Sequence, residues 1–288
     1  MRRIAVTGAN GFIGRSVVKA CLQSGYEVIT LARRPVDAGH WIQWTLGDPL
    51  PDACKPVDAV IHLASSTLVA CADVDASVQL DISGTAKLAQ STRAKGYDGS
   101  PARFIFLSSQ SATPYAKNRY GQSKYSIEQS LTNDNEIIVK PGLVFDDTGG
   151  SVFGLFEKLS RLPVLPVISS AANIQPINVD ELAECLLRIV QAQTPEKTYC
   201  LGYPKPLTFA EAISATARRS GRRPPLPLRV PLMPVKAVAW TVDKLLHLSP
   251  SIGERIDGLV ALRPMETASS LQKLGVSVEG ITPAANGP

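Results

Sequence analysis

A serine pair, a tyrosine and a lysine near the middle of the chain have the residue types and the spacing for proton transfer. Ser108 and Ser109 follow a short apolar run, and Tyr120 and Lys124 come a loop later, in a segment with a helical pattern. Residues four positions apart share one face of a helix. A tyrosine with a pKa of about 10 is a poor base at neutral pH, but a neighbouring ammonium favours its phenolate. A serine hydroxyl beside the pair can hold a substrate oxygen while Tyr120 moves the proton.

A glycine-rich segment near the start of the chain has the form of a phosphate-binding loop. It joins an apolar run to a helical pattern and reads Thr7-Gly8-Ala9-Asn10-Gly11-Phe12-Ile13-Gly14. Gly8 suits a tight turn, Gly11 lets a pyrophosphate approach the backbone, and Gly14 lets the helix pack on the strand. The free N–H groups and the positive end of the helix dipole then hold the phosphates. The segment predicts a dinucleotide site, whose nicotinamide would move a hydride while Tyr120 moves a proton.

The end of the second apolar run bears on which dinucleotide binds. NAD-binding versions of such a site usually place Asp or Glu here, on the ribose 2′-hydroxyl, whereas this chain has Ala32 followed by Arg33 and Arg34. Two arginines suit a 2′-phosphate, which a carboxylate would repel. We therefore expect NADP(H) as the preferred cofactor, with NAD(H) as the second possibility. The alternative is that the two arginines only form a basic surface turn. Asp48 could accept a hydrogen bond from the adenine amino group, although Asp before proline also suits a turn.

The elements that must hold these residues alternate between strand and helix. Strands that alternate with helices and lack polar alternation are typical of a parallel sheet covered on both faces. We expect an α/β fold, a doubly wound parallel Rossmann sheet with a smaller C-terminal substrate-binding part. The strands are predicted at residues 4–7, 27–31, 59–63, 104–107 and 137–140, and the helices after Phe12, at about 73–95 and at about 119–132.

After residue 146 the pattern becomes less regular. Asp180 is a candidate N-cap for a helix that runs to residue 190. We also expect a short helix at 152–162, a strand near 199–201 and a helix at 209–219, within a proline-rich stretch. The predicted NAD(P)-binding domain comprises residues 1–145 plus about 177–202, and the smaller part comprises about 146–176 and 203–288.

Together these motifs resemble those of the extended short-chain dehydrogenases/reductases, the NAD-dependent epimerase/dehydratase family. The resemblance covers residues 3–200 well and the remainder loosely. It rests on the glycine-rich loop, Ile61-His62-Leu63-Ala64, Gly84-Thr85, Ser108-Ser109, Tyr120-Gly121-Gln122-Ser123-Lys124 and Lys140-Pro141-Gly142.

This resemblance implies a catalytic Ser109, Tyr120 and Lys124, with Lys124 also touching the nicotinamide ribose. It implies that Ala64 lines the cofactor cleft, that Pro141 packs on the nicotinamide, and that two copies pair as a homodimer. The predicted cofactor-binding residues are Gly8, Asn10, Gly11, Phe12, Ile13, Gly14, Arg33, Arg34, Asp48, Leu63, Ala64, Tyr120, Lys124 and Pro141.

Several positions depart from the family pattern. Asp81 stands where the family usually has an Asn that supports the active-site helix. Dehydratases of the family follow the catalytic hydroxyl with two acids, but Ser109 is followed here by Gln110 and Ser111, so we do not expect dehydration. The segment from Asn173 to Pro176 lacks the basic residues that sugar-nucleotide enzymes often carry there, which weakens a sugar-nucleotide assignment.

The expected activity is that of an NADP(H)-linked oxidoreductase that reduces a carbonyl or epimerises a sugar carbon, on a nucleotide sugar. One alternative is a reductase of a non-sugar carbonyl compound, favoured by the missing basic motif and by the proline-rich apolar stretch of 204–234. A second is a sensor or scaffold that binds NADP(H) without turnover. Ser109, Tyr120 and Lys124 together argue against that alternative, because a sensor needs none of the three.

Composition limits the other classes of function. The chain has 288 residues, 44% of them hydrophobic, and a formal net charge of +5, which excludes a largely disordered protein. The apolar stretch at 233–248 is interrupted by Lys236, Asp243 and Lys244, so no membrane span is expected. The cysteines are scattered and form no Cys-x-x-Cys pair, which indicates reduced thiols in a cytoplasmic protein. They are Cys21, Cys54, Cys71, Cys185 and Cys200.

Other basic and histidine residues have plainer interpretations. Basic residues gather in 1–36 and 218–229 without aromatic interleaving or a helix-turn-helix pattern, so no nucleic-acid partner is expected. His62 is expected to be a packed histidine at a strand end. His40 and His247 have no partners at ligand spacing, and no metal site is predicted. The first residues lack the apolar core of a signal peptide.

Overall fold

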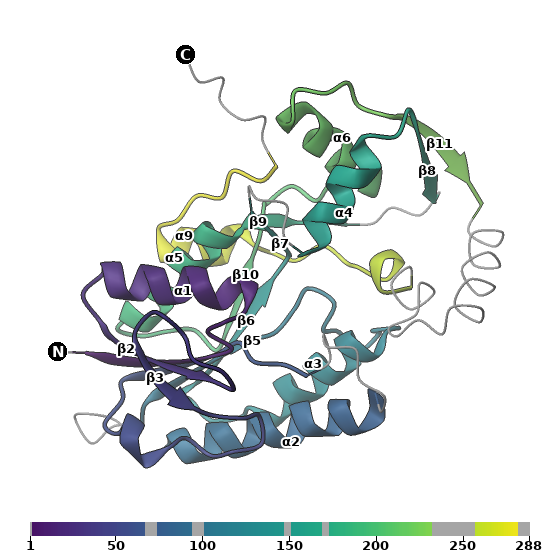
Figure 1. Ribbon diagram of the computed structural model, residues 1–288. Coiled ribbons are helices and arrows are strands. Elements are labelled where there is room, and N and C mark those ends of the chain that lie inside the picture. Colours follow the sequence, from purple (N-terminus) through teal and green to yellow (C-terminus); the bar gives the residue numbers. More distant parts are fainter. Residues whose placement is uncertain are drawn as a thin grey trace.

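A seven-stranded parallel sheet forms the centre of the computed structural model, which describes residues 2–66, 74–93, 101–146, 151–168, 173–231 and 257–281 (Figure 1). The strand order is β10-β6-β5-β4-β1-β2-β3. This is the doubly wound Rossmann arrangement that the alternating pattern predicted, because β4 and β2 flank β1 and the order reverses there. The strands are β1 Arg3–Thr7, β2 Glu27–Ala32, β3 His40–Gln43, β4 Ala59–His62, β5 Arg103–Leu107, β6 Glu136–Pro141 and β10 Thr198–Leu201.

Helices cover both faces of the sheet, and alternate residues of each strand point to opposite faces. Ile4 and Val6 of β1 share one apolar core with α1 (Phe12–Gln23), α5 (Val179–Gln191) and α9 (Ala268–Leu274). Ala5, between them, belongs to the other core, with α2 (Val74–Thr92) and α3 (Arg119–Ser130). Burial on both faces explains why the strands are nearly continuous apolar runs. A short 3-10 turn, η1 (Asp52–Cys54), precedes β4.

A smaller lobe stands beyond the carboxyl ends of the strands and has its own apolar core. Phe145, Phe156, Leu165 and Ile213 are buried in that core. Its elements in Figure 1 are β7 (Leu143–Phe145), α4 (Ser151–Ser160), β8 (Val164–Ile168), β9 (Pro176–Asn178), α6 (Phe209–Arg219) and β11 (Leu226–Val230). Parallel pairs join β7 to β9 and β8 to β11. No helix in the described ranges is long and apolar enough to cross a membrane.

The predicted elements lie where the sequence placed them, with ends that differ by a residue or two, and several smaller elements were not predicted. Residue 180 is not the N-cap that we expected, because α5 begins earlier. Asn178 caps it by accepting from the Asp180 N–H, and Glu181 reaches back to the Asn178 N–H at 3.0 Å. The paired strands of the smaller lobe and α9 were missed, and the predicted pattern at 233–248 lies outside the described residues.

Candidate active site

The glycine-rich loop turns from β1 into α1 at the carboxyl edge of the sheet. Gly8 has φ +66°, and a Cβ there would lie 2.9 Å from the Ala64 nitrogen. A Cβ on Gly14 would lie 2.2 Å from the Gly8 oxygen, so only glycine lets the helix come this close to the loop. Gly11 is the N-cap of α1 and makes no side-chain cap hydrogen bond, which leaves first-turn N–H groups for an anion. This cradle fits a dinucleotide pyrophosphate.

The two arginines after β2 are next to this loop. Asn10 fastens the turn that carries them, because its Nδ2 donates to the Arg34 oxygen at 3.1 Å and to the Pro35 oxygen at 3.3 Å. The side chains of Arg33 and Arg34 are exposed and have no ion-pair partner among the described residues. Asp48 is also exposed, and one carboxylate oxygen accepts from the Thr45 N–H at 3.1 Å within its own turn. Its role toward adenine stays a prediction.

Thr7 and His62 bind the glycine-rich loop to the end of β4. The Thr7 hydroxyl oxygen accepts from the N–H groups of Leu63 and Ala64, at 3.1 and 3.2 Å. Its own proton is therefore directed at Nδ1 of His62, 2.8 Å away, and Nε2–H of His62 is left to donate to Thr85, 3.0 Å away. Burial lowers the pKa of His62 to about 3, and the Lys124 ammonium adds to the fall while Asp81 opposes it. As expected, His62 is a packed, neutral residue.

The structure brings Ser109, Tyr120 and Lys124 together. Ser109 follows β5, and its hydroxyl lies close enough to Tyr120, in the first turn of α3, to favour the phenolate form of the tyrosine. Lys124, one turn later, is buried and donates from Nζ to the Leu107 oxygen at 3.1 Å. Its Nζ lies 4.7 Å from the Phe106 ring centroid and 5.9 Å from that of Tyr120. The three functional groups therefore meet at the carboxyl end of β5.

The neighbouring serine has a different task. Ser108 is buried and its hydroxyl donates to the Glu128 carboxylate, whereas Ser109 is partly exposed and contacts Ser111, with 3.0 Å between the hydroxyl oxygens. Of the two serines, Ser109 is the one that can reach a substrate.

Burial dominates the protonation of the tyrosine and the lysine. It raises the pKa of Tyr120 to about 12, with the Ser109 hydrogen bond opposing and the Asp81 carboxylate adding to the rise. It lowers the pKa of Lys124 to about 8, against the opposing charges of Asp81 and Glu128. Before a cofactor binds, the phenol is therefore neutral and the ammonium still protonated at neutral pH. A neutral phenol beside an ammonium is ready to donate a proton.

Asp81 replaces an amide of the family with a charge. It is buried, and its carboxylate accepts from the Ser65 hydroxyl and from the Ser66 N–H, each at 2.6 Å, and from the Ser66 hydroxyl at 2.7 Å. Burial raises the pKa of Asp81, but these hydrogen bonds and the Lys124 ammonium outweigh it, and the net shift is downward. The anion thus anchors the 65–66 turn and keeps Lys124 charged.

Glu128 connects α3, the helix that carries Tyr120 and Lys124, to the sheet. It accepts from Ser108 and forms an ion pair with Lys140, with 2.9 Å between Lys140 Nζ and Glu128 Oε2. The same Nζ donates to the Ala112 oxygen at 2.6 Å. Because both side chains are largely buried, this pair fixes α3, the end of β6 and the loop that carries Ser109 in one arrangement.

Replacing Glu128 with alanine is expected to lower the free energy of unfolding by about 3 kcal/mol, because it leaves the buried Lys140 ammonium without its partner. Glu128→Gln, which can still accept from Ser108, is expected to cost less. Urea denaturation measures both. Glu184→Ala is the matched control, since it removes an exposed ion pair with Arg188 and should cost about 0.5 kcal/mol. Equal losses for Glu128→Ala and Glu184→Ala would contradict the assignment.

Two buried glutamines fasten the C-terminal part of the chain to the catalytic loop. Gln110 Nε2 lies 2.6 Å from the Asn173 oxygen and 2.9 Å from the Arg263 oxygen. Gln175 exchanges two hydrogen bonds with Met265, accepting from its N–H at 2.6 Å and donating to its oxygen at 3.0 Å. Gly142 lets the backbone of Gln175 come close, because a Cβ at residue 142 would lie 1.7 Å from the Gln175 backbone oxygen. The residue after Ser109 is therefore a structural amide.

Sequence reasoning did not assign Thr7, Glu128, Gln110 or Gln175 to the site. The first two are polar residues at positions where the pattern requires buried side chains, which was an available signal. The contacts of the two glutamines described above reach residues 63 to 153 positions away, and no local pattern marks them. Pro141 ends β6 and accepts from the Gln110 N–H at 2.9 Å; its contact with a nicotinamide stays a prediction.

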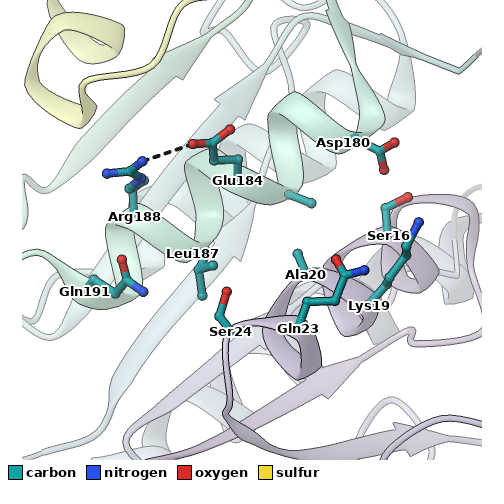
Figure 2. Close-up of a pocket in the computed structure, with 11 residues that line it drawn as sticks. Ser16, Lys19, Ala20, Gln23, Ser24, Asp180, Glu184, Leu187, Arg188 and Gln191 are labelled. Carbon is teal, nitrogen blue, oxygen red and sulfur yellow. Dashed lines mark hydrogen bonds and ion pairs between the residues drawn. The ribbon is translucent and has the colours of Figure 1, made fainter.

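A groove of about 530 Å³ lies elsewhere, on the outer surface between α1 and α5 (Figure 2). Lys19 lines one side, and the ion pair of Glu184 with Arg188 lies on the other. No predicted site residue lines it, so it is separate from the chemistry described above. No group of three or more metal-binding side chains occurs in the described ranges.

Comparison with known proteins agrees with this geometry. Residues 4–136 match the model of the NAD dependent epimerase/dehydratase family. The match covers somewhat less than half of the chain, so it shows what this part of the chain is similar to. The α/β fold with a doubly wound parallel sheet, expected from the sequence, is confirmed by the solved structures that share it.

Individual relatives have different activities. Over 195 residues the chain is 30% identical to a ceramide reductase of Caulobacter vibrioides, covering 64% of this chain and 59% of that protein. Over 144 residues it is 30% identical to a GDP-6-deoxy-D-mannose reductase of Pseudomonas aeruginosa, covering 44% and 45%. The chain thus spans less than two thirds of either relative. The human epimerase family protein SDR39U1, solved with NADPH, has the same fold, with a TM-score of 0.71, 20% identity and coverage of 96% and 95%.

Proposed function

We propose that this protein is an NADP(H)-dependent reductase of a carbonyl compound. The observation that carries the proposal is the meeting of Ser109, Tyr120 and Lys124 at the strand end next to the glycine-rich loop. The bound dinucleotide would supply the hydride. Ser109 would hold the substrate oxygen by a hydrogen bond, and Tyr120 would donate the proton that this oxygen needs as the carbonyl is reduced.

The protonation states suit the start of a carbonyl reduction. The raised pKa of Tyr120, about 12, keeps the phenol protonated, which is the form that donates to a carbonyl oxygen. The Lys124 ammonium, held by the Leu107 oxygen, stabilises the phenolate that is left after the transfer.

The residues on the side of the site away from the glycine-rich loop bear on which substrate is bound. The side-chain amides of Asn173 and Gln175 donate hydrogen bonds to backbone oxygens within residues 262–265. They therefore offer no ready partner to a nucleotide diphosphate. The match to the ceramide reductase covers more of this chain than the match to the GDP-6-deoxy-D-mannose reductase does. Both points favour a non-sugar carbonyl substrate over a nucleotide sugar. Gln110, a neutral amide whose nitrogen donates to two backbone oxygens, supports the expectation that dehydration is not the reaction.

A titration followed by a turnover screen tests the proposal. Binding of NADPH and NADH is measured by fluorescence, and consumption of NADPH is then followed with apolar ketones, aldehydes and 4-keto nucleotide sugars. Turnover of an apolar ketone with NADPH is the expected result. Turnover of the keto sugars alone would instead indicate that the substrate is a nucleotide sugar. Tight binding with no turnover on any compound would favour a sensor or scaffold.

Arg33 and Arg34 give the cofactor preference its own test. Replacing both with glutamine is expected to raise the Kd for NADPH about a hundredfold, because each arginine can give the 2′-phosphate a charge-assisted hydrogen bond, and to change the Kd for NADH little. Arg218→Gln, at an exposed arginine of α6, is the matched control. Equal losses for the two dinucleotides would remove the argument for NADP(H).

A further inference from the structure

The tip of the smaller lobe carries an unusual share of exposed apolar side chains. Eight large apolar side chains are exposed among the described residues, and five of them lie in this lobe. Figure 1 shows β8 and β11 at its outer end, away from the parallel sheet. The five are Leu155, Leu162, Val164, Leu226 and Leu228.

Strand register gathers several of these side chains on one face. In the parallel pair, Leu226 is opposite Val164, and Leu228 is opposite Pro166. Residues opposite one another and residues two apart point to the same side of a sheet. Leu226 and Leu228 are 71% and 57% exposed, whereas Leu165 and Val167, which point the other way from β8, are buried in the lobe core. Among the described residues, the outer face of this two-stranded ribbon is therefore apolar and has no other element packed on it.

Positive charge borders the same face. Arg161 and Arg223 each stand three residues before the first paired residues, Val164 and Leu226, so both lie at the same end of the ribbon as Arg222. All three arginines are exposed. The sequence has no Asp or Glu from Lys158 to Ile168 or from Ala212 to Pro231. An apolar face with a purely basic border complements a surface that is apolar below and anionic above.

Prolines make an added strand an unsuitable partner. Pro166 lies within β8 and Pro227 within β11, and each removes an N–H that an incoming strand would need. A peptide that docks by extending the ribbon is therefore disfavoured. A partner that covers the face without main-chain hydrogen bonds is left, and a bilayer surface is such a partner.

We propose that the outer face of β8 and β11 docks on the surface of an anionic phospholipid bilayer. Leu226, Leu228 and Val164 enter the boundary between headgroups and acyl chains, and the arginines contact the phosphates. The contact is peripheral and crosses no membrane. It does not depend on the reaction at Tyr120, so an inactive Tyr120→Phe chain is expected to bind vesicles as well as the natural protein does.

Sedimentation with vesicles tests the proposal on the full chain. Vesicles of phosphatidylcholine with phosphatidylglycerol are compared with vesicles of phosphatidylcholine alone. Binding is expected only to the first kind and is expected to weaken as salt is added. Leu226→Ser and Leu228→Ser should each lower the partition coefficient about tenfold. Arg222→Gln and Arg223→Gln should each lower it about fivefold.

Matched controls distinguish binding through this face from nonspecific binding to vesicles. Leu22→Ser changes a leucine of α1 that is 39% exposed, and Arg229→Gln changes an arginine of β11 that alternates with Leu228 and so points to the other side. Neither should change vesicle binding, and melting temperatures should stay alike across the set. The proposal is overturned if the natural protein does not bind anionic vesicles, or if the controls lose as much binding. It is also overturned if the leucine variants instead abolish self-association without lipid, since the face would then join two copies.

Discussion

Tyr120→Phe is expected to lower kcat for carbonyl reduction about a thousandfold and to leave the Kd for NADPH within about twofold. In the proposed function the phenol donates the proton, and the Ser109 hydroxyl near it holds the same substrate oxygen. Phenylalanine keeps the ring that Lys124 faces at 5.9 Å, so packing at the site is preserved. NADPH consumption and fluorescence titration measure the two quantities separately.

Tyr125→Phe is the control for this experiment. Tyr125 follows Lys124 on the same helix, so the substitution removes a hydroxyl from α3 without touching the proposed proton donor. It should change kcat by less than about twofold, as surface-level changes away from a site usually do. A Tyr120→Phe enzyme that keeps a tenth or more of its turnover would show that another group donates the proton.

Lowering the pH from 6.5 to 3 is expected to reduce the free energy of unfolding by about 4 kcal/mol through His62 alone. The folded protein binds a proton at His62 only near pH 3, whereas the unfolded chain binds it near the ordinary value of 6.5. Between these values the unfolded state holds the extra proton, so stability falls as the pH falls. About 2 kcal/mol of the loss should occur by pH 4.5, before the carboxylates of Asp81 and Glu136 contribute.

Urea denaturation at a series of pH values measures this loss, with His40→Asn as the control because His40 is exposed. In His62→Asn the slope between pH 6.5 and 4.5 should vanish, whatever the variant's stability at neutral pH. A proton NMR titration of the natural protein gives an independent reading, in which the His62 ring should not titrate above pH 4. A midpoint near 6.5 would refute the neutral, buried assignment.

Much of the fold could be predicted because local pattern and tertiary position agree in the parallel sheet. β1 is an uninterrupted apolar run because both of its faces are covered, and Gly8, Gly11 and Gly14 mark the turn that follows. The smaller lobe gave no such signal. β8 and β11 contain prolines and are paired only with one another, so their sequences resemble loops. The predicted N-cap of α5 differs from the observed one by two residues. Asn178 and Asp180 are both good N-cap residues, and the backbone conformation decides between them.

The candidate site was predictable where a motif carries it and not where distant segments meet. Ser109, Tyr120 and Lys124 could be predicted from their order along the chain, and the structure joins them. The resemblance already singled out Ser109, and the position of Glu128 on the facing helix adds a physical reason, because Glu128 accepts a hydrogen bond from Ser108. The raised pKa of Tyr120 depends on burial, which spacing does not reveal.

Gln110 also limits how this site could change its chemistry during evolution. Its Nε2 faces three oxygens, which belong to Asn173, Gln175 and Arg263. A glutamate at this position, one nucleotide away, would set a carboxylate against three acceptors and leave them unpaired. The chain around residues 263–265 would loosen before the new acid could serve any reaction. If the proposed function holds, a change toward elimination chemistry would therefore require the C-terminal segment to be rebuilt first.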